Sequence, residues 1–162
     1  MKIGVIADTH DHTDNLKAAL VTLHAEGVTT ILHCGDVCGP HLVQMLAGFD
    51  VWIVQGNMDG DSKLTVAVEE TFGAGRLAWL QRPTLDGTRV VMLHGDNEEA
   101  LQNLIASGEY AYVLHGHTHK RRDQTVGRTR VINPGALGGR QPQRYSFCTL
   151  DLETGETRFF EV

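Results

Sequence analysis

The chain has 162 residues, of which 41% are hydrophobic and 21% are charged, and this composition fits one globular domain with a sizeable core over residues 1–162. Its formal net charge of -6 argues against a protein that coats nucleic acid, because such proteins carry a basic face. No charged-then-apolar leader is visible, and no apolar run approaches the ~20 residues that span a bilayer. We therefore expect a cytoplasmic protein with no membrane partner and no stable nucleic-acid partner. A homo-oligomer is compatible with this composition.

The three cysteines, Cys34, Cys38 and Cys148, do not have the spacing of a disulfide framework. We expect them to be small core residues, as free cysteines usually are. Cys34 and Cys38 flank Gly35 and Asp36, so a pair of thiolate ligands is an alternative. No second cysteine pair exists to complete such a site.

The first predicted strand covers residues 2–7, which are short and continuously apolar, as buried parallel strands are. It leads into Asp8 and His10. If the chain stays extended here, these two side chains point to the same side. Asp8 taken alone could equally be a turn or helix-capping carboxylate. Apolar residues at helical spacing then predict a helix from Asn15 to about Glu26.

Two further strand-like runs also end in polar side chains. Residues 30–34 stop at a glycine followed by Asp36, and the glycine permits a sharp exit from the strand. Residues 51–55 stop just before Asn57, which alone could be an ordinary turn residue. In register with the other strand ends, Asn57 becomes a candidate ligand through its carbonyl oxygen. Between these strands we expect a short helix from His41 to Ala47.

Residues 60–83 fit either a partly helical cover over the sheet or an irregular loop beside a site. An Asp-Gly pair after them predicts a hairpin turn into a strand over residues 89–93, which ends in His94. A second helix is expected from Glu98 to Ser107. The later strand-like runs are residues 110–114, 121–125, 129–132, 145–150 and 157–162.

The run of residues 110–114 is followed by a histidine-rich segment. If this segment stays extended, His117 and His119 face a common point and offer two imidazoles to a metal ion. Histidines at this spacing are also common on solvated surfaces, so the pair gains weight only from the other strand ends. His115 fits a strand residue better than a ligand.

Five buried-looking strands thus end in side chains that can bind metal. In open α/β sheets ligands bind just outside the carboxyl ends of the strands, so these donors should converge. One zinc ion needs only three or four ligands, whereas seven donors suit two ions that share a carboxylate. Asp36 is the natural bridge, because it stands alone at the end of a central strand. The seven residues are Asp8, His10, Asp36, Asn57, His94, His117 and His119.

As an ordered set, these motifs resemble the signature of the calcineurin-like metallophosphoesterases. The motifs are Asp8-x-His10, Gly35-Asp36, Gly56-Asn57-x-Asp59, His94 and Gly116-His117-x-His119. The small size and the turn at Asn133-Pro134-Gly135 resemble the small bacterial and archaeal phosphodiesterases of that superfamily in particular. The resemblance implies an α/β fold, a four-layer αββα sandwich in which two mixed β-sheets are flanked by helices.

The resemblance also implies two divalent metal ions and the residues that hold them. One ion would be bound by Asp8, His10 and His119, the other by Asn57, His94 and His117, with Asp36 bridging both. Manganese is the first expectation, and such mixed ligands also accept nickel, iron, cobalt or zinc. The catalytic residues implied are Asp36, Asn57, His94 and Asp59, the last as a carboxylate that orients a neighbouring group.

The activity implied is hydrolysis of a small phosphate ester, foremost a diester, by a hydroxide that bridges the two metal ions. One alternative is a metal-containing but non-catalytic interaction module, similar to the retromer subunit that shares this fold. A second alternative is an α/β binding domain without metal. The substrate walls are expected from residues 60–83 and 138–144, where Arg140 and Arg144 are either phosphate contacts or ordinary solvated arginines.

One position departs from the family pattern. Many members have a histidine between the asparagine and the aspartate of the third motif, where it can protonate the leaving group, and this chain has Met58. Methionine cannot transfer a proton, so we expect activated diesters to react faster than alkyl monoesters unless a group such as His12 substitutes.

Overall fold

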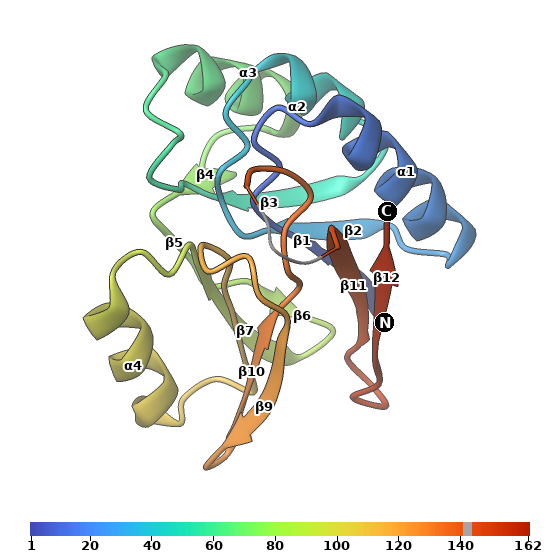
Figure 1. Cartoon of the computed structure of the whole chain (residues 1–162). Coiled ribbons are helices and arrows are strands. Elements are labelled where there is room, and N and C mark those ends of the chain that lie inside the picture. Colours follow the sequence, from blue (N-terminus) through green and yellow to red (C-terminus); the bar gives the residue numbers. More distant parts are fainter. Residues whose placement is uncertain (141–143) are drawn as a thin grey trace.

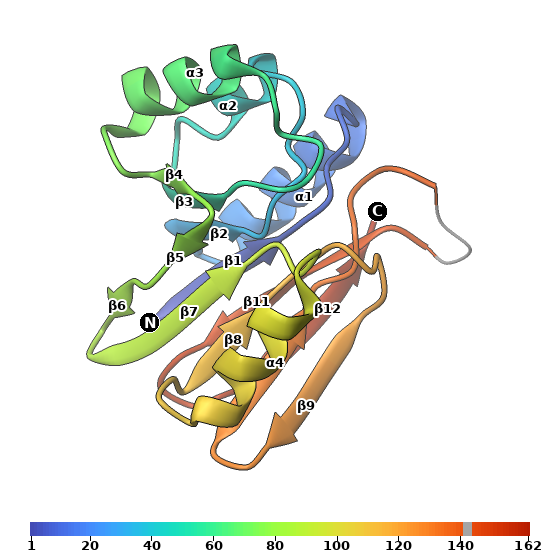
Figure 2. The same ribbon diagram turned by 90° about the vertical axis from the view of Figure 1, so that its left-hand side faces the viewer.

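Two β-sheets lie face to face between two layers of helices in the computed structural model, which describes residues 1–140 and 144–162 (Figures 1 and 2). The first sheet has the order β12-β11-β1-β2-β3-β4, with β1 (Lys2–Ile6), β2 (Thr30–His33), β3 (Asp50–Val54), β4 (Leu77–Ala78), β11 (Ser146–Asp151) and β12 (Thr157–Glu161). The second has the order β5-β7-β8-β10-β9, with β5 (Leu80–Gln81), β7 (Thr88–Leu93), β8 (Tyr112–Leu114), β9 (Arg122–Val126) and β10 (Thr129–Asn133). The short strand β6 (Thr84–Leu85) pairs with β7.

Four helices form the outer layers of the described structure: α1 (Thr13–Ala25), α2 (His41–Met45), α3 (Ser62–Phe72) and α4 (Glu98–Ser107). The first three lie over the first sheet, as Figure 1 shows, and α4 packs on the second sheet. The predicted four-layer αββα sandwich is therefore confirmed. Within the described residues, no helix is both long and apolar enough to span a bilayer.

Parallel pairing brings the polar strand ends to common edges. β1, β2 and β3 are parallel neighbours in the first sheet, and β7 and β8 are parallel neighbours in the second. In the first sheet Ile6 pairs with His33, and His33 pairs with Ile53, so the residues that follow leave the sheet side by side. This register positions the predicted ligands.

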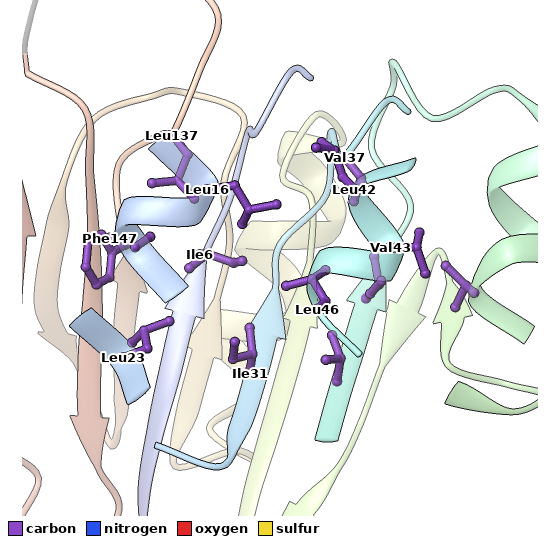
Figure 3. Close-up of a cluster of buried hydrophobic side chains, with 14 of the residues drawn as sticks. Ile6, Leu16, Leu23, Ile31, Val37, Leu42, Val43, Leu46, Leu137 and Phe147 are labelled. Atoms are coloured by element: carbon purple, nitrogen blue, oxygen red, sulfur yellow. The ribbon is translucent and has the colours of Figure 1, made fainter. Parts of the chain in front are cut away.

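The helix-facing side of the first sheet forms one core cluster. Ile6 and Ile31 point from β1 and β2 toward Leu16 and Leu23 of α1, and all four are buried (Figure 3). Full burial of such a side chain contributes about 1.5–3 kcal/mol relative to exposure. Leu16 and Leu23 are among the apolar residues whose helical spacing predicted this helix.

A second core cluster lies between the two sheets. Val5 and Leu32, which are neighbours of the helix-facing residues, pack here with Met92 and Leu114 from the second sheet. Successive side chains of a strand point to opposite faces, so these strands are buried on both sides. That double burial is the reason why their sequences are continuously apolar.

The structure decides the alternatives left open for residues 60–83. Their polar start and apolar interior form α3, in which Asp61 caps the helix by accepting a hydrogen bond from the backbone N–H of Lys63. The partly helical cover is therefore correct. The Asp86-Gly87 hairpin between β6 and β7 and the helix over Glu98–Ser107 are confirmed. The other segment expected to line the substrate site is residues 138–144. Its residues 141–143 lie outside the described residues.

Candidate metal centre

The seven predicted ligands come together where β1, β2 and β3 of one sheet and β7 and β8 of the other end. One group contains Asp8, His10 and His119. His119 Nε2 lies 3.4 Å from Asp8 Oδ1 and 3.2 Å from His10 Nε2. These atoms come from the segments that follow β1 and β8, which are far apart in the sequence.

A second group forms around the end of β3. Asn57 Oδ1 lies 3.0 Å from His94 Nε2 and 3.2 Å from His117 Nδ1. The rings of His94 and His117 meet edge to face with their centroids 5.1 Å apart. His94 is buried, whereas Asn57 and His117 are exposed, so this side of the centre opens to solvent.

Asp36 lies between the two groups. Its Oδ2 is 3.6 Å from His10 Nε2 and 3.4 Å from His94 Nε2, one imidazole of each group. Asp8 also lies near both, because its carboxylate belongs with Asp36 and His94 to a further cluster that could hold a metal ion. Two buried carboxylates thus occupy the middle of the centre.

The spacing of these atoms fits bound metal. Ligand atoms about 2.1 Å from one tetrahedral ion are ~3.4 Å from each other. The distances of 3.2 to 3.6 Å around Asp36 and His119 match that separation. Donor orientation fits too, because His94 Nδ1 donates to the carbonyl oxygen of Cys34 at 2.9 Å and directs Nε2 toward oxygens of Asp36 and Asn57. Without metal a proton on Nε2 joins these atoms, and a metal ion can take the place of that proton.

The extended presentation expected for these residues is wrong. β1 ends at Ile6 and β8 ends at Leu114, before either motif begins. Of the eight non-glycine residues with positive φ in the described chain, five are predicted ligands: Asp8, His10, Asp36, His117 and His119. His117 and His119 accordingly face different groups and do not face a common point. Such backbone is costly, at about 1–3 kcal/mol per residue, and it clusters at functional sites.

Charge in the centre shifts the pKa values of its members. Burial lowers the pKa of His94, but its contacts with Asp36 and with the Cys34 carbonyl outweigh burial and raise it to about 9. Burial raises the pKa of Asp36. The contacts with His94 and with the Met58 N–H lower it by more than burial raises it, so the net shift is downward. The pKa of His119 is raised by its bond with Asp8. Carboxylates that remain ionised beside imidazoles are suited to hold cations.

Asp59 does not join the seven. Its buried carboxylate accepts hydrogen bonds from the backbone N–H groups of Asp36 and Gly56 through Oδ2 and of Cys38 through Oδ1, at 2.8 to 2.9 Å. Burial raises its pKa despite these bonds. Asp59 thus joins the loops after β2 and β3, and its predicted orienting role has a concrete target in the backbone of Asp36.

The positioning roles of two residues were not found by sequence reasoning. Asn133, interpreted only as part of a turn, donates from Nδ2 to the Gly116 carbonyl at 2.7 Å and so holds the loop that carries His117. Gly56 is required because a Cβ there would lie 2.1 Å from Asp36 Oδ1. Asn133 could have been suspected of such a role, because it is a polar residue at the end of the apolar strand β10.

His33 is a further buried residue that the sequence did not single out. Its Nδ1 accepts from the backbone N–H of Gly35 at 3.2 Å, which puts the ring proton on Nε2, where it donates to Thr9 Oγ1 at 2.8 Å. The neutral ring therefore connects the loop after β1 to the loop after β2. Burial lowers the pKa of His33 from 6.5 to about 3.

This shift makes stability depend on pH. The unfolded chain takes up a proton on His33 below pH 6.5, whereas the folded chain does so only near pH 3, so the stabilisation is complete above pH 6.5 and is lost as the pH falls toward 3. We expect His33 to lower the free energy of unfolding of the metal-free protein by about 2 kcal/mol between about pH 7 and about pH 5. Urea unfolding of wild type and His33→Gln measures it. His33→Gln should lose this part of the pH dependence of the free energy of unfolding, whereas the control His24→Gln, at an exposed position, should keep it. Equal pH profiles for wild type and His33→Gln would refute the assignment of this dependence to His33.

The remaining candidate residues lie around the centre. Cys34 and Cys148 are buried core residues, and no cysteine belongs to either metal-capable cluster found in the described chain, which disfavours thiolate ligands. Arg144 forms an exposed ion pair with Glu161 at 2.9 Å, so it behaves as a solvated surface arginine. His12 caps α1 by accepting a hydrogen bond from the backbone N–H of Asn15.

Comparison with known proteins agrees with this geometry. A family model for the calcineurin-like phosphoesterase superfamily domain matches residues 1–155. Phosphodiesterase MJ0936 from Methanocaldococcus jannaschii is 32% identical over 161 residues, which cover 98% of this chain and 97% of that protein. The structure of an archaeal phosphodiesterase has 31% identity and a TM-score of 0.91, and the match covers both chains completely. Zinc-bound Vps29 from Entamoeba histolytica, at 21% identity and a TM-score of 0.70 over 100% and 98% of the two chains, shares the fold. The chain belongs to the calcineurin-like phosphoesterase superfamily, whose metallophosphoesterase fold implies divalent metal ions.

Proposed function

We propose that the chain is a dinuclear metal-dependent phosphodiesterase. The observation that carries this proposal is the position of the Asp36 carboxylate. Its Oδ1 accepts a hydrogen bond from the Met58 N–H at 2.8 Å, and its Oδ2 lies within 3.6 Å of one imidazole from each group of ligands. The backbone thus fixes Oδ1, and Oδ2 is placed between the two groups of ligands.

We assign the bridge to Asp36 in preference to Asp8, although Asp8 also lies near both groups. Both oxygens of Asp8 are within 3.2 Å of the backbone nitrogen of His117, and its Oδ1 lies 3.4 Å from His119 Nε2 of the first group. The proposed ligands are then Asp8, His10 and His119 on one side and Asn57, His94 and His117 on the other. When bound here, two divalent ions supply an activated water and neutralise phosphoryl oxygens. Manganese is the proposed metal.

The residues of the chain hold this centre in place. Backbone carbonyls of Cys34 and Arg140 lie 2.9 Å and 3.3 Å from the Nδ1 atoms of His94 and His119, so each ring keeps Nε2 for the centre. Such contacts fix the tautomer and orientation of a ligand. Because Asn57 and His117 are exposed, a small phosphate ester can reach the centre from solvent.

The exposed side carries no evident proton donor at the third motif. Met58 is 58% exposed beside Asn57 and offers only an apolar side chain to a leaving group. Proton transfer to a leaving group is commonly worth ~10²–10⁴-fold in rate. We therefore propose activated phosphodiesters as the class of ester hydrolysed best, with small diesters as the natural substrate class.

The test is hydrolysis of bis-p-nitrophenyl phosphate by metal-stripped protein titrated with manganese, nickel or zinc. We expect turnover to appear with metal and to be greatest near two ions per chain. It should exceed the turnover of an alkyl phosphate monoester by at least ~10²-fold. His94→Ala should abolish the activity, and the exposed His24→Ala is the matched control.

Three results would count against the proposal. Two bound ions without turnover of any ester would favour a metal-containing interaction module. Absence of metal binding by direct metal analysis would favour a binding domain without metal. Faster hydrolysis of alkyl monoesters than of activated diesters would contradict the substrate class.

A further inference from the structure

The chain between β10 and β11 runs beside the segment that carries Asp8. The backbone N–H groups of Leu137 and Gly138 donate to the carbonyl oxygens of Ala7 and Asp8, at 3.1 Å and 2.8 Å. These bonds attach residues 137–140, which we call the glycine loop, to the end of β1. The loop is therefore fixed next to the first group of ligands.

Gly139 of this loop lies against two ligands of the first group. A Cβ atom at this position would be 2.8 Å from His10 Cδ2 and 2.8 Å from His119 Cε1, and real Cβ atoms essentially never come closer than 3.0 Å to another atom. In each ring this carbon is bonded to Nε2, the nitrogen that lies in the centre. Only glycine lets the backbone pass this close to both rings.

The next residue of the loop contacts His119 directly. The carbonyl oxygen of Arg140 lies 3.3 Å from His119 Nδ1. Because a carbonyl oxygen can only accept a hydrogen bond, the ring proton is on Nδ1 and Nε2 is left for a metal ion. The position of the backbone at Gly139 and Arg140 thus decides how this ligand is oriented.

Tyr145 holds that backbone from the other end of the segment. Its hydroxyl donates to the Gly139 carbonyl oxygen at 2.9 Å. This carbonyl belongs to the planar peptide that leads to Arg140, so the bond restrains the whole peptide. Tyr145 is itself tied to the fold, because its carbonyl oxygen accepts from the backbone N–H of Val162 at 3.2 Å and its ring contacts the ring of His12.

We propose that Tyr145 is a positioning residue for the first metal ion and acts on His119 through the peptide between Gly139 and Arg140. The inference rests on the proposed function, because it requires the two-ion centre. It also separates the two ions. The imidazole of His94 in the second group is oriented by a backbone carbonyl outside the glycine loop, so loss of the Tyr145 hydroxyl should weaken only the first ion.

The experiment follows zinc binding to the full chain by nuclear magnetic resonance of the histidine ring nitrogens, in the presence of a competing chelator. His10 and His119 report on the first ion, and His94 and His117 report on the second. Tyr145→Phe keeps the ring and removes only the hydroxyl. We expect the zinc concentration at half-saturation to rise ~10-fold at His10 and His119 and to stay unchanged at the other two rings.

Gly139→Ala tests the same loop by a second route. The added methyl group meets His10 and His119, so it should weaken the first ion by more than Tyr145→Phe does. Gly27→Ala is the matched control, because φ is +75° at Gly27 and +73° at Gly139, but no atom lies within 4 Å of a Cβ at Gly27. Both alanines adopt the same unfavourable backbone, and only one touches the centre.

Tyr110→Phe is the control for loss of a hydroxyl, because Tyr110 accepts a hydrogen bond from Arg82 Nε at 2.9 Å and contacts no predicted ligand in the described residues. It should leave zinc binding at all four rings unchanged. Unchanged zinc binding in Tyr145→Phe, or equal weakening of both ions, would overturn the inference while the wild type still binds two ions. If the wild type itself does not bind two zinc ions, the inference fails together with the proposed function.

Discussion

Asp36→Asn is expected to lower metal-dependent hydrolysis of bis-p-nitrophenyl phosphate by about 10³-fold and to reduce bound metal from two ions per chain toward one. The amide has the shape of the carboxylate, and its oxygen can still accept from the Met58 N–H at the position of Oδ1. What the substitution removes is the charge at Oδ2, between His10 and His94. The loss of activity and of metal therefore reports on the bridging charge of Asp36, and not on a change in the loop that Met58 belongs to.

The measurement combines metal analysis after gel filtration with steady-state kinetics on the same samples. Asp14→Asn is the matched control, because Asp14 is exposed in the first turn of α1 and its carboxylate is not part of the centre. It should keep both metal content and turnover. If Asp36→Asn keeps two ions and full activity, Asp36 does not bridge, and Asp8 becomes the candidate for that role.

The strands and their polar ends could be predicted because they follow from local chemistry. The runs around Ile6 and Ile31 are apolar on both faces, and each gives way abruptly to Asp8 or Asp36, which a buried strand cannot contain. Helix α4 was predicted with its bounds because apolar residues recur on one face and Gly108 follows it, and the structure adds an asparagine cap at its start and a φ of 62° at Gly108. In these places local sequence and tertiary structure agree.

The geometry of the centre could not be predicted in the same way. The left-handed backbone of His117 and His119 is unfavourable by itself and exists because surrounding contacts impose it. One such contact is the bond from Asn133 to the Gly116 carbonyl, which joins segments 17 residues apart. A pattern of alternating side chains describes an extended strand, and it therefore directed two histidines to a common point. The family resemblance assigned them to two ions, and the structure directs them to two groups.

Asp59→Ala tests how far the centre depends on a contact of this kind. The substitution leaves the buried backbone N–H groups of Asp36 and Gly56 and the partly buried one of Cys38 without their acceptor. An unsatisfied buried donor costs about 1–3 kcal/mol, and the same burial that raises the Asp59 pKa partly offsets the loss when the carboxylate is removed. We expect the free energy of unfolding to fall by about 3 kcal/mol and metal affinity to fall by ~10–100-fold.

Asp61→Ala provides the matched control, two residues further along the chain. Its carboxylate also accepts a backbone hydrogen bond, from Lys63 at 2.9 Å, but it is exposed and only caps α3, so the expected cost is about 1 kcal/mol with metal affinity unchanged. Urea unfolding and metal titration of both variants separate the two effects. Asp59→Asn should resemble Asp59→Ala, because one amide oxygen cannot replace two carboxylate oxygens that accept from different loops. If Asp59→Ala weakens metal binding no more than Asp61→Ala does, Asp59 stabilises the fold without positioning Asp36.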